Sequence, residues 1–261
     1  MFTMYHFAWL AICAVLIVGM ARYLHQHKPS LQCVLSFCCA GAALSEFIKV
    51  FSVIELVPSS DGSGLYPYME LQHLPFHLCS IQILFIFYAR FSQNRRLRTA
   101  LLAFMYPTCL LGALSALALP SIFTASIDVS QAFTHPLAYQ FFLYHTMLVI
   151  LGLYIYQSGQ VDIHSRHYLS TMVLVCLVGF LSLYLNSAFA TPVYQNGELV
   201  SVEYTTNFFF TYKTPIGLQL TQLWQWYLYL IILLILAIVL IALLYIPVFI
   251  KDAAAKKASA D

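Results

Sequence analysis

Residues 74–87 read LPFHLCSIQILFIF, and this stretch decides how the rest of the chain is interpreted. After Cys79 the run is almost wholly apolar, which is typical of a helix that crosses a lipid bilayer. Pro75 marks the predicted start of this helix, because proline is favoured at the first helical position and disrupts a helix further in. His77 and Cys79 then lie in the first two turns. Ionisable groups inside an apolar span are costly and are by default a functional hypothesis.

The composition extends this interpretation to the whole chain. Of its 261 residues, 61% are hydrophobic and 8% are charged, and the mean hydropathy is +0.81. A soluble domain carries about 25% charged residues, so the sequence predicts a polytopic membrane protein. The net charge of +2 is too small to suggest nucleic acid as a partner. No phosphate-binding loop, HExxH motif or CxxC pair occurs, and we expect neither a cofactor nor a resident metal.

Seven apolar stretches predict an all-α fold of seven transmembrane helices, because about 20 apolar residues cross a bilayer. They cover residues 4–24, 31–54, 71–91, 97–119, 136–157, 167–189 and 217–248. We expect residues 1–250 to form a single seven-helix transmembrane domain and residues 251–261 to form a short cytoplasmic tail. The Asn196-Gly197 pair between apolar residues predicts a β-hairpin in the last long loop.

The basic residues predict the orientation of these helices. Ten of the twelve lysines and arginines fall in the turns after the first, third and fifth spans and in the tail. Such loops stay on the cytoplasmic side of a membrane. The sequence therefore predicts an external N-terminus, a cytoplasmic C-terminus and a multi-pass protein of the cell membrane.

Polar groups from several spans converge at one predicted depth. At about 1.5 Å per residue, Cys79 lies about 6–12 Å below the outer surface and His145 about 14 Å below it. Glu46 and Lys49 reach the outer half of the second span, and Asn186 ends the sixth span at the outer face. We therefore expect a polar cavity that opens towards the outer leaflet or the outer aqueous phase.

Cys79 and His145 form the predicted catalytic pair. His77 cannot be the base, since side chains at i and i+2 of a helix do not face each other. A base from another helix is needed to make the thiolate that nucleophilic catalysis requires, and His145 is the best-placed histidine. His73 and His77 would share one helical face at i and i+4, where they could orient the site, hold a metal or bind a phosphate head group.

Each of these residues has a plainer alternative. Cys79 could act as a small packing residue, and His145 could make only an interhelical hydrogen bond. Glu46 and Lys49 are three residues apart and should pair with each other, either as structural glue or as a wall of the site. Lys213 is the one basic residue on the predicted outer side. It could bind an anion, or it could be a snorkelling lysine with no ligand.

Three landmarks in order resemble the YwaF-type integral membrane family, which comprises bacterial relatives of the transmembrane protein 164 family. They are Leu-Pro-Phe-His-Leu-Cys at residues 74–79, Phe-Phe-Leu-Tyr-His at 141–145, and an Asn207-aromatic segment that ends in Lys213-Thr-Pro. The resemblance implies a seven-span fold and phospholipid acyltransfer. Carried over to this chain, it implies that Cys79 holds the acyl group and that His145 acts as the base.

Two classes of function follow from these observations. The first is a lipid-modifying acyltransferase whose substrate is a membrane phospholipid, with the binding residues His73, His77, Glu46, Lys49, Asn186, Asn207 and Lys213 around the pair. The alternative is a non-enzymatic binder or transporter of a small solute or metal, with His73 and His77 as ligands. The sequence gives no oligomeric state.

Overall fold

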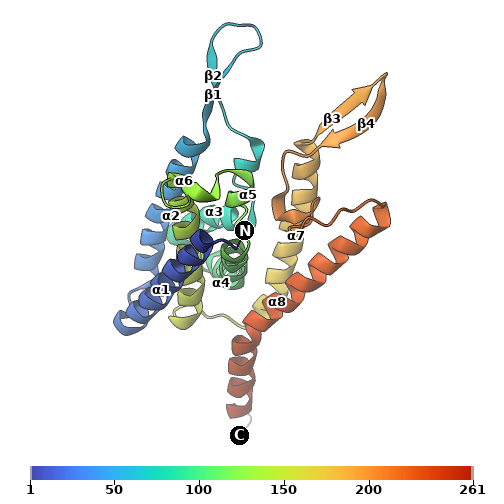
Figure 1. Cartoon of the computed structure of the whole chain (residues 1–261). Helices are drawn as coiled ribbons and strands as arrows, with labels where there is room; N and C mark the ends of the chain where they lie inside the picture. Colours follow the sequence, from blue (N-terminus) through green and yellow to red (C-terminus); the bar gives the residue numbers. More distant parts are fainter. Residues whose placement is uncertain (1, 260–261) are drawn as a thin grey trace. The chain divides into compact units, whose positions relative to one another are not determined.

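The structure is a computed structural model that describes residues 2–259 (Figure 1). Residue 1 of the predicted domain and residues 260–261 of the predicted tail lie outside this range. The α-helices are α1 (Met4–His27), α2 (Leu31–Val53), α3 (Leu78–Phe91), α4 (Arg95–Ala118), α5 (Ile122–Ala125), α6 (Pro136–Gln157), α7 (Arg166–Ala188) and α8 (Leu223–Ala258). The strands are β1 (Glu55–Pro58), β2 (Leu65–Tyr68), β3 (Thr191–Gln195) and β4 (Glu198–Glu203).

The predicted class of fold, a mostly helical multi-pass membrane protein, is confirmed. Within the described part of the chain, six helices are long and apolar enough to cross a membrane: α1, α2, α4, α6, α7 and α8. The apolar helix α3 has 14 residues and a length of about 21 Å, which is less than the roughly 30 Å of a bilayer core. The count of seven spans and their orientation therefore stay predictions.

The predicted start of the third span at Pro75 is wrong, because α3 begins at Leu78. Leu74 precedes a proline and is extended, with φ −61° and ψ 147°, as the proline ring requires of its neighbour. The Phe76 N–H then bonds the Leu74 carbonyl at 2.8 Å. A turn therefore replaces the first helical residues, and a short 3₁₀ helix, Leu71–His73, precedes it.

The last helix also differs from the predicted span 217–248. It begins at Leu223, because Gly217 has a positive φ of 74° and because the Gln225 side chain caps the chain just before the helix. Gln225 Oε1 accepts hydrogen bonds from the N–H groups of Thr221 and Gln222, at 2.9 and 3.1 Å. At its other end the helix continues to Ala258, through most of the predicted tail.

The chain forms two compact units, each described here by itself. The first holds residues up to Ser52, Cys79–Thr171, and the chain from Ile241 onward. The second holds Val53–Leu78 and Met172–Leu240. The prediction of one transmembrane domain over residues 1–250 is not tested by this division and stays a prediction.

Close helix packing defines the first unit. At Gly152 on α6, an added Cβ would lie 2.9 Å from Leu110 Cγ and 3.1 Å from the Tyr106 carbonyl oxygen of α4. Trp9 of α1 stacks between Phe133 and Phe142, with ring centroids 5.2 and 4.8 Å away. The absence of a side chain at Gly152 thus lets α4 and α6 approach, and aromatic stacking fixes α1 on α6.

A proline inside α4 leaves one backbone carbonyl without its helical donor, and a side chain of α8 donates to that carbonyl instead. Pro107 has no N–H, so the Ala103 carbonyl four residues earlier loses its helical donor. The hydroxyl of Tyr245, from the part of α8 in the first unit, donates to that carbonyl at 3.0 Å. Tyr245 is fully buried, and this hydrogen bond joins two helices that are far apart in the sequence.

A polar latch ties the α6–α7 loop to the end of α8. His164 lies between two carboxylates, 2.8 Å from Asp162 and 3.2 Å from Asp252. The N–H and hydroxyl of Ser165 donate to the same Asp252 carboxylate, at 2.7 and 2.6 Å. Hydrogen bonds to Asp162 and Asp252 raise the pKa of His164 above its ordinary value of 6.5.

Two antiparallel hairpins belong to the second unit and are visible as arrows and loops in Figure 1. The predicted hairpin at Asn196-Gly197 is confirmed, since Gln195 pairs with Glu198 across this two-residue turn. Both turn residues have positive φ, 52° and 82°, as a type I′ turn requires. The hairpin β1–β2 was not predicted, and each of its strands contains a proline, Pro58 and Pro67.

Candidate functional site

Cys79 lies near the start of α3, as the sequence predicts, and because the helix begins three residues later than expected, Cys79 is in its first turn. The residue is partly exposed and its thiol is free. N–H groups in the first turn of a helix have no intrahelical acceptor, and the helix dipole favours negative charge there. The local backbone is therefore suited to a thiolate or to an oxyanion next to it.

Tyr144 links this turn to α6. Its hydroxyl donates to the Cys79 carbonyl at 2.8 Å, across 65 positions of sequence, and the side chain is 5% exposed. The sequence marks Tyr144 only as a neighbour of His145, so the contact itself could not be predicted. It establishes that α6 meets α3 at the level of Cys79.

His145 is the next residue of α6 and is 4% exposed. Its Nδ1 lies 2.6 Å from the Phe141 carbonyl. A carbonyl can only accept a hydrogen bond, so Nδ1 carries the proton and Nε2 keeps its lone pair. Nε2 is buried and has no hydrogen-bond partner. The His145 ring therefore has the tautomer of a general base, and it makes no hydrogen bond to Cys79 in this structure.

A second set of polar side chains lies on the Cys79 face of α3. Gln82, three residues after Cys79, is fully buried. Its amide donates to Thr108 Oγ1 at 2.9 Å and accepts from the Cys109 thiol at 3.4 Å. These residues were missed at the sequence level, although an amide inside an apolar run was a visible signal. They join α3 to α4 just below the thiol.

The predicted pair of Glu46 and Lys49 is confirmed. Lys49 Nζ lies 2.7 Å from a Glu46 carboxylate oxygen, and their side chains are 28% and 12% exposed for Glu46 and Lys49 respectively. Lys49 is within electrostatic range of Cys79, and Glu46 is within range of Tyr144. The ion pair thus belongs to the surroundings of Cys79.

His73 and His77 lie outside α3, so the predicted common helical face does not exist. His73 ends the 3₁₀ helix, and His77 follows the turn at Pro75. In the second unit, the His77 ring meets the Phe208 ring edge-on at 5.0 Å between centroids. Over the described range, no group of three or more His, Cys, Asp or Glu residues is arranged to hold a metal ion.

Asn186 is fully buried and organises the segment around Phe208. Its amide donates to the Phe208 carbonyl at 3.0 Å and to Thr211 Oγ1 at 2.8 Å. Its oxygen accepts from the Phe208 N–H at 2.9 Å and from Thr206 Oγ1 at 3.0 Å. The hydrogen-bonding capacity that made Asn186 a predicted binding residue is used within the protein.

Asn207 closes the turn that carries Lys213. Its Oδ1 accepts from the N–H groups of Tyr212 and Lys213, at 3.1 and 3.0 Å, and its amide donates to the Lys213 carbonyl at 2.8 Å. Within this turn, Phe209 and Phe210 have φ values of 57° and 55°, which are strained for large L-residues. The two asparagines hold this strained segment, and Lys213 is exposed on it.

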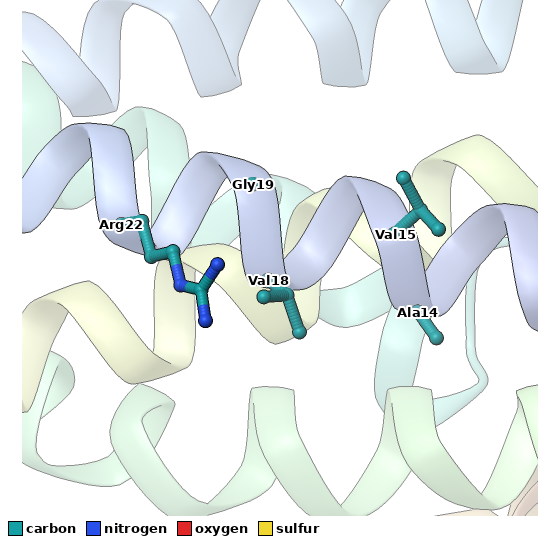
Figure 2. Close-up of a pocket in the computed structure, with 5 residues that line it drawn as sticks. All are labelled: Ala14, Val15, Val18, Gly19 and Arg22. Atoms are coloured by element: carbon teal, nitrogen blue, oxygen red, sulfur yellow. The ribbon is translucent and has the colours of Figure 1, made fainter.

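A shallow, open hollow of about 420 Å³ lies along α1 (Figure 2). It is lined by Ala14, Val15, Val18, Gly19 and Arg22. A second hollow shares Arg22 and is lined also by Ala21, His25, Gln26 and Gln157. No predicted site residue lines either hollow, and the predicted cavity beside Cys79 stays a prediction.

Comparison with known proteins gives the family of the chain. The TMEM164 family model matches residues 1–245 of the 261. The chain belongs to the TMEM164 family. The match spans every helix up to Tyr245 of α8 and includes all the predicted site residues, and the YwaF-type bacterial relatives fit the same TMEM164 family. Comparisons with curated proteins and with solved structures gave no match.

Proposed function

We propose that this TMEM164 family member is an acyltransferase that moves a fatty acyl chain between membrane phospholipids through a thioester on Cys79. His145 is the base in this proposal. The observation that carries it is the hydrogen bond from Tyr144 to the Cys79 carbonyl, because it joins the turn with the thiol to the helix turn with His145.

The chemistry follows from the state of the two groups. His145 Nε2 takes the thiol proton, directly or through one water, and the thiolate attacks the ester carbonyl of a phospholipid. The tetrahedral intermediate then collapses. The lysophospholipid oxygen leaves with the proton from the imidazolium, and the acyl group stays on Cys79. A second lysophospholipid hydroxyl gives its proton to His145, attacks the thioester and releases the thiolate.

Several features support this sequence of steps. Free N–H groups at the start of α3 would bind the oxyanion, and the lone pair of His145 Nε2 is buried and unpartnered. Glu46 and Lys49 supply charges within range of Cys79 and Tyr144, where a lipid head group would lie. The proposed orientation opens this site to the outer leaflet.

The first prediction tests this proposal with purified protein in proteoliposomes that contain a labelled phospholipid and an unlabelled lysophospholipid. We expect Cys79→Ser and His145→Gln each to lower acyl transfer by at least about 100-fold, because each removes a reacting group. Mass spectrometry of the wild type should find an acyl adduct on Cys79 alone. Cys176→Ser, which changes an exposed thiol of α7, is the control and should keep full activity.

The metal content of the same samples distinguishes the acyltransferase from the alternative function, a non-enzymatic metal binder. Stoichiometric metal that is lost in His73→Ala, together with no acyl transfer by the wild type, would replace the acyltransferase by a metal binder.

A further inference from the structure

The side chain of Tyr144 lies on the face of α6 that meets α3 at Cys79. Its hydroxyl bonds the Cys79 carbonyl at 2.8 Å, and it is within electrostatic range of Cys79 and Glu46. One turn earlier on the same face, Gln140 Nε2 donates to Ser45 Oγ of α2 at 2.7 Å. One turn later, Met147 packs on Gly41 of α2, where an added Cβ would lie 2.6 Å from its sulfur.

Gln140, Tyr144 and Met147 therefore form a stripe at i, i+4 and i+7 that docks α6 on its neighbours. Of these three contacts, only the one made by Tyr144 reaches α3. Successive residues of a helix differ by about 100° in direction, so the rotation that brings Tyr144 to Cys79 also sets the direction of the His145 ring.

We infer that Tyr144 is a positioning residue, whose hydroxyl keeps the first turn of α3 and the His145 turn of α6 at the same level. The consequences for acyl transfer and for alkylation of the thiol both rest on the proposed function, because both need His145 as the base for Cys79, but the consequence for alkylation does not require acyl transfer to occur. Loss of the hydroxyl frees the two helices to shift relative to each other, and a shift of about 1 Å in a reacting group can cost about 100-fold in rate.

Tyr144→Phe tests this inference, because it removes the hydroxyl and keeps the ring. Tyr245→Phe is the matched control. It also removes a buried tyrosine hydroxyl that donates to a backbone carbonyl, but on Ala103. Three quantities are measured for the full-length protein. The rate constant for alkylation of Cys79 by N-ethylmaleimide is followed by mass spectrometry as a function of pH, and acyl transfer gives kcat and KM. The melting temperature of each variant reports its folding.

We expect Tyr144→Phe to slow the alkylation of Cys79 at neutral pH by about tenfold and to shift its pH profile upward. It should lower kcat by a similar factor with KM changed less than about twofold. Tyr245→Phe should leave all these values unchanged, even if it lowers the melting temperature as much. Equal or faster alkylation of Cys79 in Tyr144→Phe would overturn the inference. A wild type without acyl transfer would refute the proposed function, while the alkylation rates would still decide the role of Tyr144.

Discussion

The polar side chains of this protein are of two kinds. Some make all their hydrogen bonds within the fold, and others keep a hydrogen-bonding atom without a partner. Asn186 and Asn207 make bonds to the backbone of residues 206–213 from both ends of their amides. An amide with satisfied partners stabilises the segment that it bonds, and that of Asn186 is also fully buried. His145 differs, because Nδ1 is engaged and Nε2 is buried without a partner. A buried, unsatisfied nitrogen costs free energy, and the proposed function would use this one as the acceptor of the thiol proton.

A second prediction concerns His164 and pH. The pKa of His164 is raised in the folded state by hydrogen bonds to Asp162 and Asp252, so its charged form stabilises the fold. This contribution is complete below the ordinary pKa of 6.5 and is lost as the pH rises through the raised value. We expect His164→Gln to lower the melting temperature at about pH 6 and to have little effect at about pH 9.

The measurement is thermal unfolding of both proteins across that pH range. His27→Gln is the control, because His27 is exposed and its ring bonds only a carbonyl of its own helix. A difference between wild type and His164→Gln that grows as the pH rises would contradict the prediction.

The helices and their contacts show what the sequence could predict. Apolar length predicted five helices, α1, α2, α4, α6 and α7, with nearly correct bounds, and Asn196-Gly197 predicted its hairpin, because both signals are local. The start of α3 is harder to predict, because Pro75 can occupy either the first position of a helix or a turn. The turn forms there, so His73 and His77 do not share a helical face.

Sequence reasoning named several residues near Cys79, whose functional roles stay predictions, but it missed Gln82, Thr108 and Cys109 and the contacts between the helices. Cys79, His145 and the Glu46–Lys49 pair follow from the cost of polar groups in apolar spans. The bonds from Tyr144 to Cys79 and from Gln82 to Thr108 and Cys109 depend on how three helices are rotated about their axes. A hydrophobic pattern that is apolar on all sides carries little information about rotation, so these contacts required the structure.

A third prediction belongs to the contact of α4 and α6. Gly152→Ala should destabilise the protein by about 1–3 kcal/mol, because the new Cβ would meet Leu110 Cγ at 2.9 Å and the Tyr106 carbonyl at 3.1 Å. Gly19→Ala is the control, since nothing lies within 4 Å of a Cβ there, and should be neutral or stabilising by up to about 1 kcal/mol. Unfolding in mixed detergent measures both, and equal stability of the two variants would exclude close packing at Gly152.

At the scale of the whole molecule, four helices have residues in both compact units: α7 and α8, and also α2 and α3, which have one end residue each in the second unit. α7 passes from the first unit to the second at Thr171–Met172, and α8 passes back at Leu240–Ile241. A continuous helix carries its hydrogen bonds across such a boundary. Asn186 is therefore joined to the first unit through the continuous helix α7, whereas Lys213 lies in the irregular segment between β4 and α8.

A fourth prediction gives the orientation of the molecule in the membrane. Reporter fusions at Gly62, Arg96, Asp128, Asp162, Gly197 and the C-terminus should alternate between external and cytoplasmic signals, beginning outside at Gly62. The reason is that ten of the twelve lysines and arginines lie in one set of turns and the tail, and such loops stay inside. A cytoplasmic signal at Gly197 would reverse the assignment and would place the proposed site at the inner leaflet.

The prolines of the hairpins have a consequence for the behaviour of the protein at high concentration. Leu56 and Leu65 are 64% and 62% exposed on β1 and β2, and a two-stranded ribbon has two free edges. Such edges invite strands from other molecules and begin aggregation. Pro58 and Pro67 on this ribbon, and Pro192 on β3, have no N–H to offer to an incoming strand. The ribbon β1–β2 and the edge of β3 can therefore display apolar side chains while offering fewer N–H groups to intermolecular sheets than strands without proline would.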